Sequence, residues 1–188
     1  MHRPVVGIMG ASEQEGLTES DKVRLKGLAE RLGAALAMHR CVLATGATTG
    51  LPDLVSRAFR SEGGFALGIS PATNHKEHRE LYKLPDDGAD VIIYTGFGFK
   101  GRNLINVRSA DIVILFGGAT GTLNEFTIAY DEGKVVGILE GSGGITDHIQ
   151  EIIDFCKKPT PGVVLFDKDP EMLVQRCLEA LSSLRKSS

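Results

Sequence analysis

A glycine- and threonine-rich stretch, residues 117–122, has the residue types best suited to binding chemistry. It follows an apolar run, 112–116, and a helical pattern begins after it, with Glu125 near the start of that pattern. A helix start leaves backbone N–H groups unpaired, and glycine lets the backbone approach a bound group closely. The stretch therefore predicts a phosphate-binding loop, with Glu125 at its edge in the first helical turn. The residues concerned are Gly117, Gly118, Ala119, Thr120, Gly121 and Thr122.

The loop is not a Walker A loop, because no Gly-Lys-Ser/Thr follows it. A tight strand-to-helix turn that needs glycine only sterically is the alternative. Two more glycine-bearing loops, 46–50 and 96–101, also follow strand-like runs, and this favours ligand binding. The residues expected to contact a ligand from the other loops are Gly10, Ala11, Ser12, Gly46, Thr48, Thr49 and Gly98.

The 96–101 stretch matches G-x-G-x-x-G before a helix that is expected to begin at Arg102. A dinucleotide site also needs an acidic residue at the end of the next strand, and Phe116-Gly117 stands there, so NAD is disfavoured. The forked guanidinium of Arg102 suits a phosphate or a base carbonyl. In isolation, a solvated surface arginine would be the simpler interpretation.

Strand-like apolar runs alternate with helical patterns along residues 1–188, which predicts one α/β domain. The fold class expected is Rossmann-like and doubly wound: a mostly parallel sheet of about seven strands with helices on both faces. Strands are expected at 4–9, 41–45, 65–70, 91–95, 112–116, 135–139 and 163–166. Helices are expected at 21–38 with a Thr18 or Ser20 cap, from near Pro52 to a stop at Gly63, at 102–109, from the 117–122 loop to near Gly133, after a Thr146 cap, and after Asp169.

The composition of the chain excludes some classes of partner. The chain is 42% hydrophobic with a net charge of -3, and it has no basic tail and no apolar run of membrane-spanning length. Nucleic-acid and membrane partners are therefore not expected. Three scattered cysteines and the absence of a signal-peptide layout predict reduced thiols and a cytoplasmic location, with Cys156 and Cys177 in the core.

Residues 71–88 are polar and predict an irregular lid or insertion, which should line the pocket together with residues 11–17. His75 and His78 within it have a spacing that metal ligands can use, but no nearby residue completes a set. We expect a solvated loop and no metal site. The sequence has no G-x-S-x-G motif, so it gives no support to a Ser-His-Asp catalytic triad.

The residues from Gly117 to Glu125 resemble the P-G-G-x-G-T-x-x-E motif of the LOG (lonely guy) family, historically mislabelled lysine decarboxylases. Arg102 stands where that family has a functional arginine at the head of the preceding helix, and Ala110-Asp111 and the 46–58 region also resemble it. The chain departs from the motif at four places. Phe116 replaces the proline, Ala119-Thr120 fill one position, Asn124 replaces the first glutamate of a pair, and Asn103 replaces a lysine.

The resemblance implies hydrolysis of the N-glycosidic bond of nucleoside 5′-monophosphates to a free base and ribose 5-phosphate, without a cofactor. The 117–122 loop would hold the phosphate. Glu125 would contact the ribose and stabilise the oxocarbenium-like transition state or position water, and Arg102 would orient the substrate or help the base to leave. Family members commonly form homodimers or larger homo-oligomers.

The four departures move the chain toward a wider group of LOG-like nucleotide-binding proteins. That group includes proteins that carry molybdenum cofactor, a pterin with a phosphate, without hydrolysing a nucleotide. Binding of a phosphorylated nucleotide-like ligand is the leading hypothesis, with a non-catalytic carrier or sensor of such a cofactor as the alternative. A pure assembly module would need neither the glycine loops nor Arg102.

Overall fold

One seven-stranded sheet forms the centre of the computed structural model, which describes residues 3–12 and 16–187. All six strand pairings are parallel, in the order β4-β3-β2-β1-β5-β6-β7. The predicted fold class is therefore confirmed. The chain order reverses between β1 and β5, and ligands bind at such a switch point in parallel sheets. The strands are β1 (Val5–Gly10), β2 (Val42–Thr45), β3 (Ala66–Ser70), β4 (Val91–Tyr94), β5 (Ile112–Phe116), β6 (Val135–Leu139) and β7 (Val163–Asp167).

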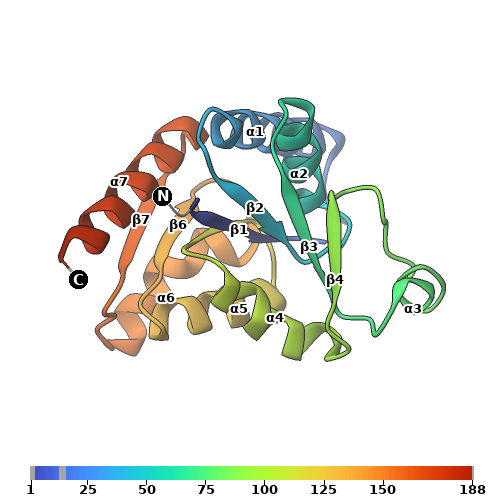
Figure 1. Cartoon of the computed structure of the whole chain (residues 1–188). Helices are drawn as coiled ribbons and strands as arrows, with labels where there is room; N and C mark the ends of the chain where they lie inside the picture. Colours follow the sequence, from blue (N-terminus) through green and yellow to red (C-terminus); the bar gives the residue numbers. More distant parts are fainter. Residues whose placement is uncertain (1–2, 13–15, 188) are drawn as a thin grey trace.

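Helices cover both faces of the sheet (Figure 1). One apolar cluster joins the sheet to α1, α2 and α7, and a second joins it to α4, α5 and α6. The short α3 stands apart, between β3 and β4 in the chain (Figure 1). The helices are α1 (Glu19–Ala37), α2 (Leu51–Ser61), α3 (His75–Glu80), α4 (Gly98–Ser109), α5 (Thr120–Asp131), the 3₁₀ helix η1 (Gly144–His148), α6 (Ile149–Cys156) and α7 (Pro170–Ser187).

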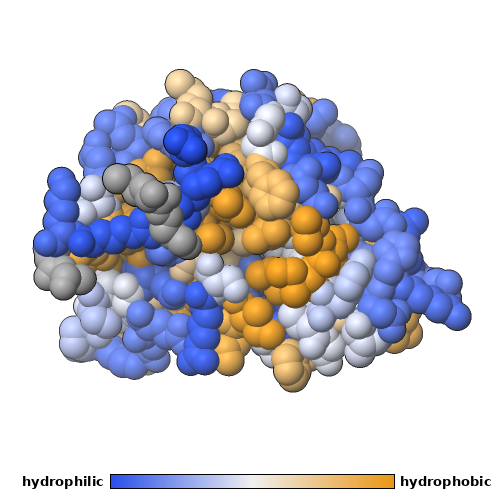
Figure 2. All heavy atoms as spheres, in the orientation of Figure 1, coloured by the Kyte–Doolittle hydropathy of each residue, from blue (hydrophilic) through white to orange (hydrophobic). Residues whose placement is uncertain are grey.

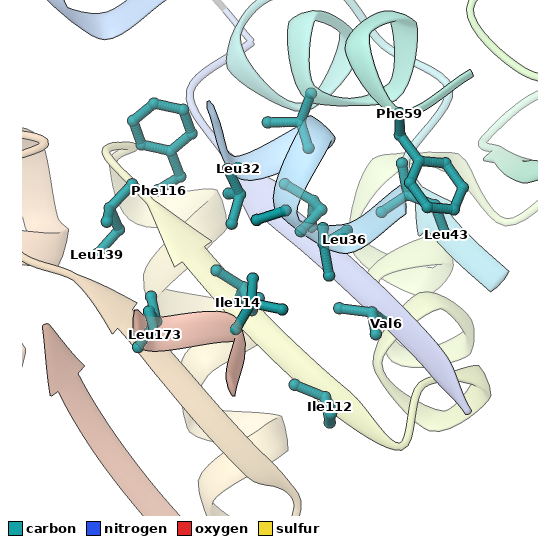
Figure 3. Close-up of a cluster of buried hydrophobic side chains, with 14 of the residues drawn as sticks. Val6, Leu32, Leu36, Leu43, Phe59, Ile112, Ile114, Phe116, Leu139 and Leu173 are labelled. Carbon is teal, nitrogen blue, oxygen red and sulfur yellow. The ribbon is translucent and has the colours of Figure 1, made fainter. Parts of the chain in front are cut away.

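The central strand β5 is buried along its whole length. Ile112, Ile114 and Phe116 point into the cluster with α1 and α7 (Figure 3), whereas Val113 and Leu115 belong to the cluster on the opposite face. A strand buried on both faces reads as a continuous apolar run, as predicted for 112–116. Burial of each such side chain contributes roughly 1.5–3 kcal/mol to the stability of the fold. The end of β5 is therefore held in a fixed position, and the loop starts from it.

Two helix starts differ from the sequence predictions and change the setting of the site. α4 begins at Gly98 and not at Arg102, so its first turn includes most of the presumed glycine loop. α5 begins at Thr120, which places Glu125 in the second turn and not the first. Glycine weakens a helix by only about 1 kcal/mol, so tertiary packing can override it. At the start of α1, Thr18 caps the helix through its hydroxyl, which confirms one of the two predicted caps.

Three further predictions about polar segments were wrong. Residues 71–88 are not wholly irregular, because they contain α3, whose Asn74 cap accepts a hydrogen bond from the Glu77 N–H. His78 is fully buried and not solvated. Thr146 lies inside η1 and does not cap a helix from outside.

The cysteine prediction was half right. Cys177 and Cys41 are buried in the core, but Cys156 at the end of α6 is exposed. All three are free thiols. Burial raises the pKa of Cys177 to about 12, so this thiol stays protonated at neutral pH.

Apolar side chains gather on the face formed by β4 and α4 (Figure 2). Val91 and Ile93 of the edge strand β4 are each nearly half exposed, and Phe97 and Leu104 are also exposed. Among the described helices, none is long and apolar enough to cross a bilayer.

Candidate functional site

A cavity of about 820 Å³ opens at the carboxyl ends of the strands. The loops after β1, β2 and β5 meet there, together with α4, as expected at the switch point. The predicted site residues that line it are Gly10, Ala11, Ser12, Gly46, Thr48, Thr49, Arg102, Gly117, Gly118, Ala119, Gly121, Thr122 and Glu125. Thr120 and Gly98 are not among the lining residues.

The loop after β5 is held by hydrogen bonds to residues 142–146, which include the start of η1. The Gly117 N–H donates to Ser142 Oγ (2.9 Å), and the Thr146 hydroxyl donates to the Gly117 carbonyl. The Gly118 carbonyl accepts a hydrogen bond from the Ile145 N–H (2.8 Å). The Gly117 amide is therefore already occupied, and any anion binding falls to the amides that follow it.

The N-terminus of α5 has no side-chain cap and no acidic residue in its first turn. Gly118, Ala119, Gly121 and Thr122 line the cavity at this end. Unpaired N–H groups and the positive end of the helix dipole make such a terminus attractive to an anion. Gly118 has φ +91°, and a Cβ there would lie 2.0 Å from Thr122 Oγ1, so only glycine fits.

Arg102 and Glu125 face each other across the inner end of the cavity. Nη1 of Arg102 lies 3.6 Å from Oε1 of Glu125, and each residue is only 6% exposed. This distance suits an ion pair but is too long for a hydrogen bond. Arg102 Nε is buried, and within the described residues it has no hydrogen-bond partner. Buried polar atoms are normally satisfied, so this unpaired donor is an exception within the site.

Gly46 makes room for the arginine. A Cβ on Gly46 would lie 2.1 Å from Nη1 of Arg102. The glycine therefore acts at least in part by allowing the guanidinium to pack against the backbone after β2. Packing of Arg102 is thus a physical reason for glycine at position 46, which the sequence had suggested only as a ligand contact.

Burial governs the ionisation of the pair. It raises the pKa of Glu125 to about 7, against the opposing effects of Arg102 and then Lys100. Burial also lowers the pKa of Arg102, and Glu125 partly offsets this. Both charged forms lose hydration, so a ligand that supplies hydrogen bonds to either group would be bound favourably.

Asn103 and Asn124 lie beside this pair and contact each other, with their side-chain amides 3.0 Å apart. These are two of the positions at which the chain departs from the LOG motif. The structure thus shows that the two departures are neighbours. A neutral amide pair stands where the motif would place a lysine and a glutamate.

Several lining residues were not predicted as site residues. Lys100 and Asn103 lie on α4, and Tyr82 stacks edge-on against Phe99 with ring centroids 5.3 Å apart. The expectation that 71–88 and 11–17 supply pocket wall is confirmed for residues 82–84 and for Ala11, Ser12 and Leu17, while residues 13–15 lie outside the described part of the chain. Ser142, Gly143 and Gly144 were missed, although glycines directly after a strand are the same signal that identified the other loops.

No group of three or more His, Cys, Asp or Glu residues that could hold a metal ion occurs in the described chain. His75 pairs with Asp86 at the surface, with Nε2 2.8 Å from Oδ2. His78 instead bonds Ser70 and the Pro85 carbonyl. The two histidines therefore have separate structural partners.

Comparison with known proteins places the chain in a family. Residues 3–174 match the SLOG cluster4 family. The chain belongs to the SLOG cluster4 family. A relative from Archaeoglobus fulgidus, described as an uncharacterized protein, is 30% identical over 157 residues, covering 80% of this chain and 93% of the relative.

Two solved structures resemble this SLOG cluster4 protein along nearly all of its length. The structural-genomics target TM1055 is 28% identical with a TM-score of 0.79, covering 94% of this chain and 99% of the target. The molybdenum cofactor binding protein of the phototrophic bacterium Rippkaea orientalis is 27% identical with a TM-score of 0.70, covering 98% of each chain. The resemblance found in the sequence is therefore confirmed at the level of the SLOG family, and membership of LOG itself stays a prediction.

Proposed function

We propose that this SLOG cluster4 protein binds a phosphate-bearing, nucleotide-sized ligand and that it carries molybdenum cofactor. The strongest support is that one cavity is lined both by the uncapped N-terminus of α5 and by the buried Arg102–Glu125 pair. The similar protein from Rippkaea orientalis is described as binding that cofactor. This choice favours the alternative hypothesis over the leading one from the sequence.

The residues present fit such a ligand. Its phosphate suits the free amides at the start of α5, and its pterin ring carries N–H groups and a carbonyl that suit a buried carboxylate and guanidinium. The cavity of about 820 Å³ is within the usual range for small-molecule sites. Tyr82 and Phe99 provide an aromatic wall at its outer part.

Hydrolysis of a nucleoside 5′-monophosphate is the second candidate, and the position of Glu125 favours it. Glu125 lies five residues beyond the start of α5, which is about 7.5 Å along the helix axis. This is near the span from a 5′-phosphate to the anomeric carbon. Water would add to that carbon as the bond to the base nitrogen breaks, the base leaving with a proton. The Glu125 carboxylate would stabilise the positive charge that develops.

Two measurements on the full chain separate these functions. Freshly purified protein is analysed by mass spectrometry and by pterin fluorescence after oxidative release, and its affinity for molybdopterin is measured by calorimetry. In parallel, the protein is incubated with AMP, GMP, CMP and UMP, and free base is quantified. Pterin binding without base release supports a carrier. Base release supports the hydrolase, and a protein that binds neither pterin nor monophosphates overturns the proposal.

Variants of the two parts of the site sharpen the test. Arg102→Ala removes the guanidinium but leaves the α5 terminus intact, so phosphate-only probes should still compete for the site. Glu125→Gln keeps the size of the side chain and should abolish base release while leaving phosphate binding within a fewfold of wild type. Loss of phosphate binding in both variants would contradict the assignment of the phosphate to α5.

Association into homodimers or larger assemblies also stays a prediction. The exposed apolar side chains of β4 and α4 are the surface on which to test it (Figure 2). Replacing Ile93 with lysine should reduce the sedimentation coefficient if copies meet there. The matched change Val23→Lys, on the exposed face of α1, should not.

A further inference from the structure

The side-chain amide of Asn103 stands between Asn124 and Glu125. Asn103 is 4% exposed and comes from α4, whereas the other two come from α5. Its amide can face either way, because the oxygen and the NH₂ group are nearly the same size. The two orientations give Glu125 different neighbours.

In one orientation, the Asn103 NH₂ group donates to Asn124 Oδ1 (3.0 Å), and the Asn103 oxygen faces the Phe99 carbonyl and Glu125, both acceptors. Turned by 180°, the NH₂ group donates to the Phe99 carbonyl (2.9 Å) and to Glu125 Oε1 (3.3 Å). The Asn103 oxygen then lies 3.0 Å from Asn124 Oδ1, so the Asn124 amide must turn as well to donate to it. The second orientation supplies a donor to the Phe99 carbonyl and to Glu125, whereas the first sets the Asn103 oxygen against both of these acceptors.

We propose that Asn103, in the second orientation, is the positioning residue that donates a hydrogen bond to Glu125, directs its carboxylate at the cavity and favours its ionised form. The inference rests on the proposed function only in taking Glu125 to be a ligand contact. The charged groups that act on Glu125 are Arg102, at 3.6 Å, and Lys100, both from α4. Neither is placed to donate a hydrogen bond to it among the described contacts, so Asn103 fills that role.

The physical consequence concerns protonation. A hydrogen bond donated to the charged form of a carboxyl lowers its pKa, and loss of that bond raises it. Burial already raises the pKa of Glu125 to about 7, so a modest further change moves it across neutral pH. The orientation of one amide thus decides whether the site presents a carboxylate or a carboxylic acid.

Asn124 offers a sharp test because it can be changed to favour either orientation. In Asn124→Asp the new carboxylate can only accept, so it should draw the Asn103 NH₂ group away from Glu125. Asn124→Ala removes the partner but leaves Asn103 free to donate to Glu125. We therefore expect the aspartate variant, and not the alanine variant, to raise the pKa of Glu125.

The measurement is a pH titration of the Glu125 side-chain carbon by NMR in ligand-free, isotope-labelled full-length protein, with the resonance assigned from Glu125→Gln. Asn103→Ala and Asn124→Asp should each raise the pKa by about one unit, a tenfold change in proton affinity. Asn124→Ala should change it by less than about 0.3 units. An unchanged pKa in Asn103→Ala, or a larger shift in Asn124→Ala than in Asn124→Asp, overturns the proposal.

The carboxylate introduced by Asn124→Asp could also raise the pKa of Glu125 by direct repulsion. The double variant Asn103→Ala, Asn124→Asp distinguishes this effect from one transmitted by the Asn103 amide. If the amide transmits the effect, introducing Asn124→Asp into the Asn103→Ala protein shifts the pKa of Glu125 much less than introducing it into wild type. An equal shift in both backgrounds means that the new carboxylate acts by charge alone and contradicts the proposal. Because Asn124 is only partly buried, Asn124→Asp keeps the test usable if Asn103→Ala fails to fold. The titration uses no ligand, so its failure is distinct from failure of the proposed function.

Discussion

The guanidinium of Arg102 packs so tightly against Gly46 that a Cβ on that glycine would lie 2.1 Å from Nη1. The two residues come from α4 and from the loop after β2, far apart in the sequence. The position of the arginine opposite Glu125 therefore depends on a missing side chain elsewhere in the chain.

Replacing Gly46 with alanine should weaken ligand binding by tenfold or more, about 1.4 kcal/mol, because the new methyl group displaces the guanidinium from Glu125. Calorimetry with molybdopterin and with AMP measures this. The matched control is Gly27→Ala, a partly buried glycine within α1 where an added Cβ meets nothing within 4 Å. Wild-type affinity in the Gly46 variant would show that Arg102 is not a ligand contact.

Gly118→Ala should lose phosphate binding and cost roughly 1–3 kcal/mol of stability, because it combines a positive φ with a clash against Thr122 Oγ1. Gly121→Ala, one turn further into the same loop and helix start, adds a Cβ to open space. It should keep the stability of wild type, because the added methyl group meets no neighbour and the backbone there has no positive φ. Chemical denaturation and phosphate competition measure the two effects, and equal behaviour of the two variants would contradict the role given to the loop.

The free energy of unfolding should fall as pH rises from about 4.5 to about 7, because Glu125 loses its proton over this range. Burial raises its pKa to about 7 from the ordinary glutamate value of 4.5, so the folded state holds the proton more tightly than the unfolded state. The resulting stabilisation, up to about 3 kcal/mol, is fully present below the pKa of the unfolded state. It is lost as the pH rises through the pKa of the folded state. Denaturant titrations at pH 5 and pH 8 should show a difference that shrinks in Glu125→Gln. The same difference in both proteins would count against this assignment.

His78→Ala should loosen residues 71–88 and with them the pocket wall at 82–84. The ring Nε2 lies 2.8 Å from the Pro85 carbonyl and must donate to it, so Nδ1 of the neutral ring accepts from Ser70 Oγ, also at 2.8 Å. Hydrogen exchange should accelerate across 71–88, with a stability loss of roughly 1–3 kcal/mol. His75→Ala, at the exposed neighbouring position, should leave the exchange rates of the segment almost unchanged. Faster exchange throughout the chain would indicate general destabilisation instead.

The fold could be predicted because the strands are continuous apolar runs, and the predicted bounds of β5 and β6 match the structure. Helix starts were less accurate. Gly98 and Gly101 read as loop residues, yet both are helical: the Gly98 N–H donates to the Pro71 carbonyl (3.1 Å), and a Cβ on Gly101 would lie 2.7 Å from Phe97 Cβ. The shift of Glu125 into the second turn of α5 has the same origin, since the first turn is built from Thr120-Gly121-Thr122.

Most predicted lining residues could be found because the carboxyl ends of parallel strands share one edge of the sheet. What the sequence did not indicate was burial of polar groups. Nothing in the spacing of His75 and His78 distinguishes an exposed residue from a fully buried one. Contacts between distant residues, such as Asn103 with Asn124, depend on how α4 packs on α5, and a single sequence does not encode that distance in any local pattern.

The two hydroxyls that hold Gly117, from Ser142 and Thr146, have a consequence for the rate and strength of binding. They fix the backbone after β5 when the chain folds, so an arriving anion meets donors that are already in place. The conformational entropy of ordering that turn is lost during folding and does not oppose association. A pre-organised receptor of this kind can be selective for the shape of a phosphate even when few side chains touch it.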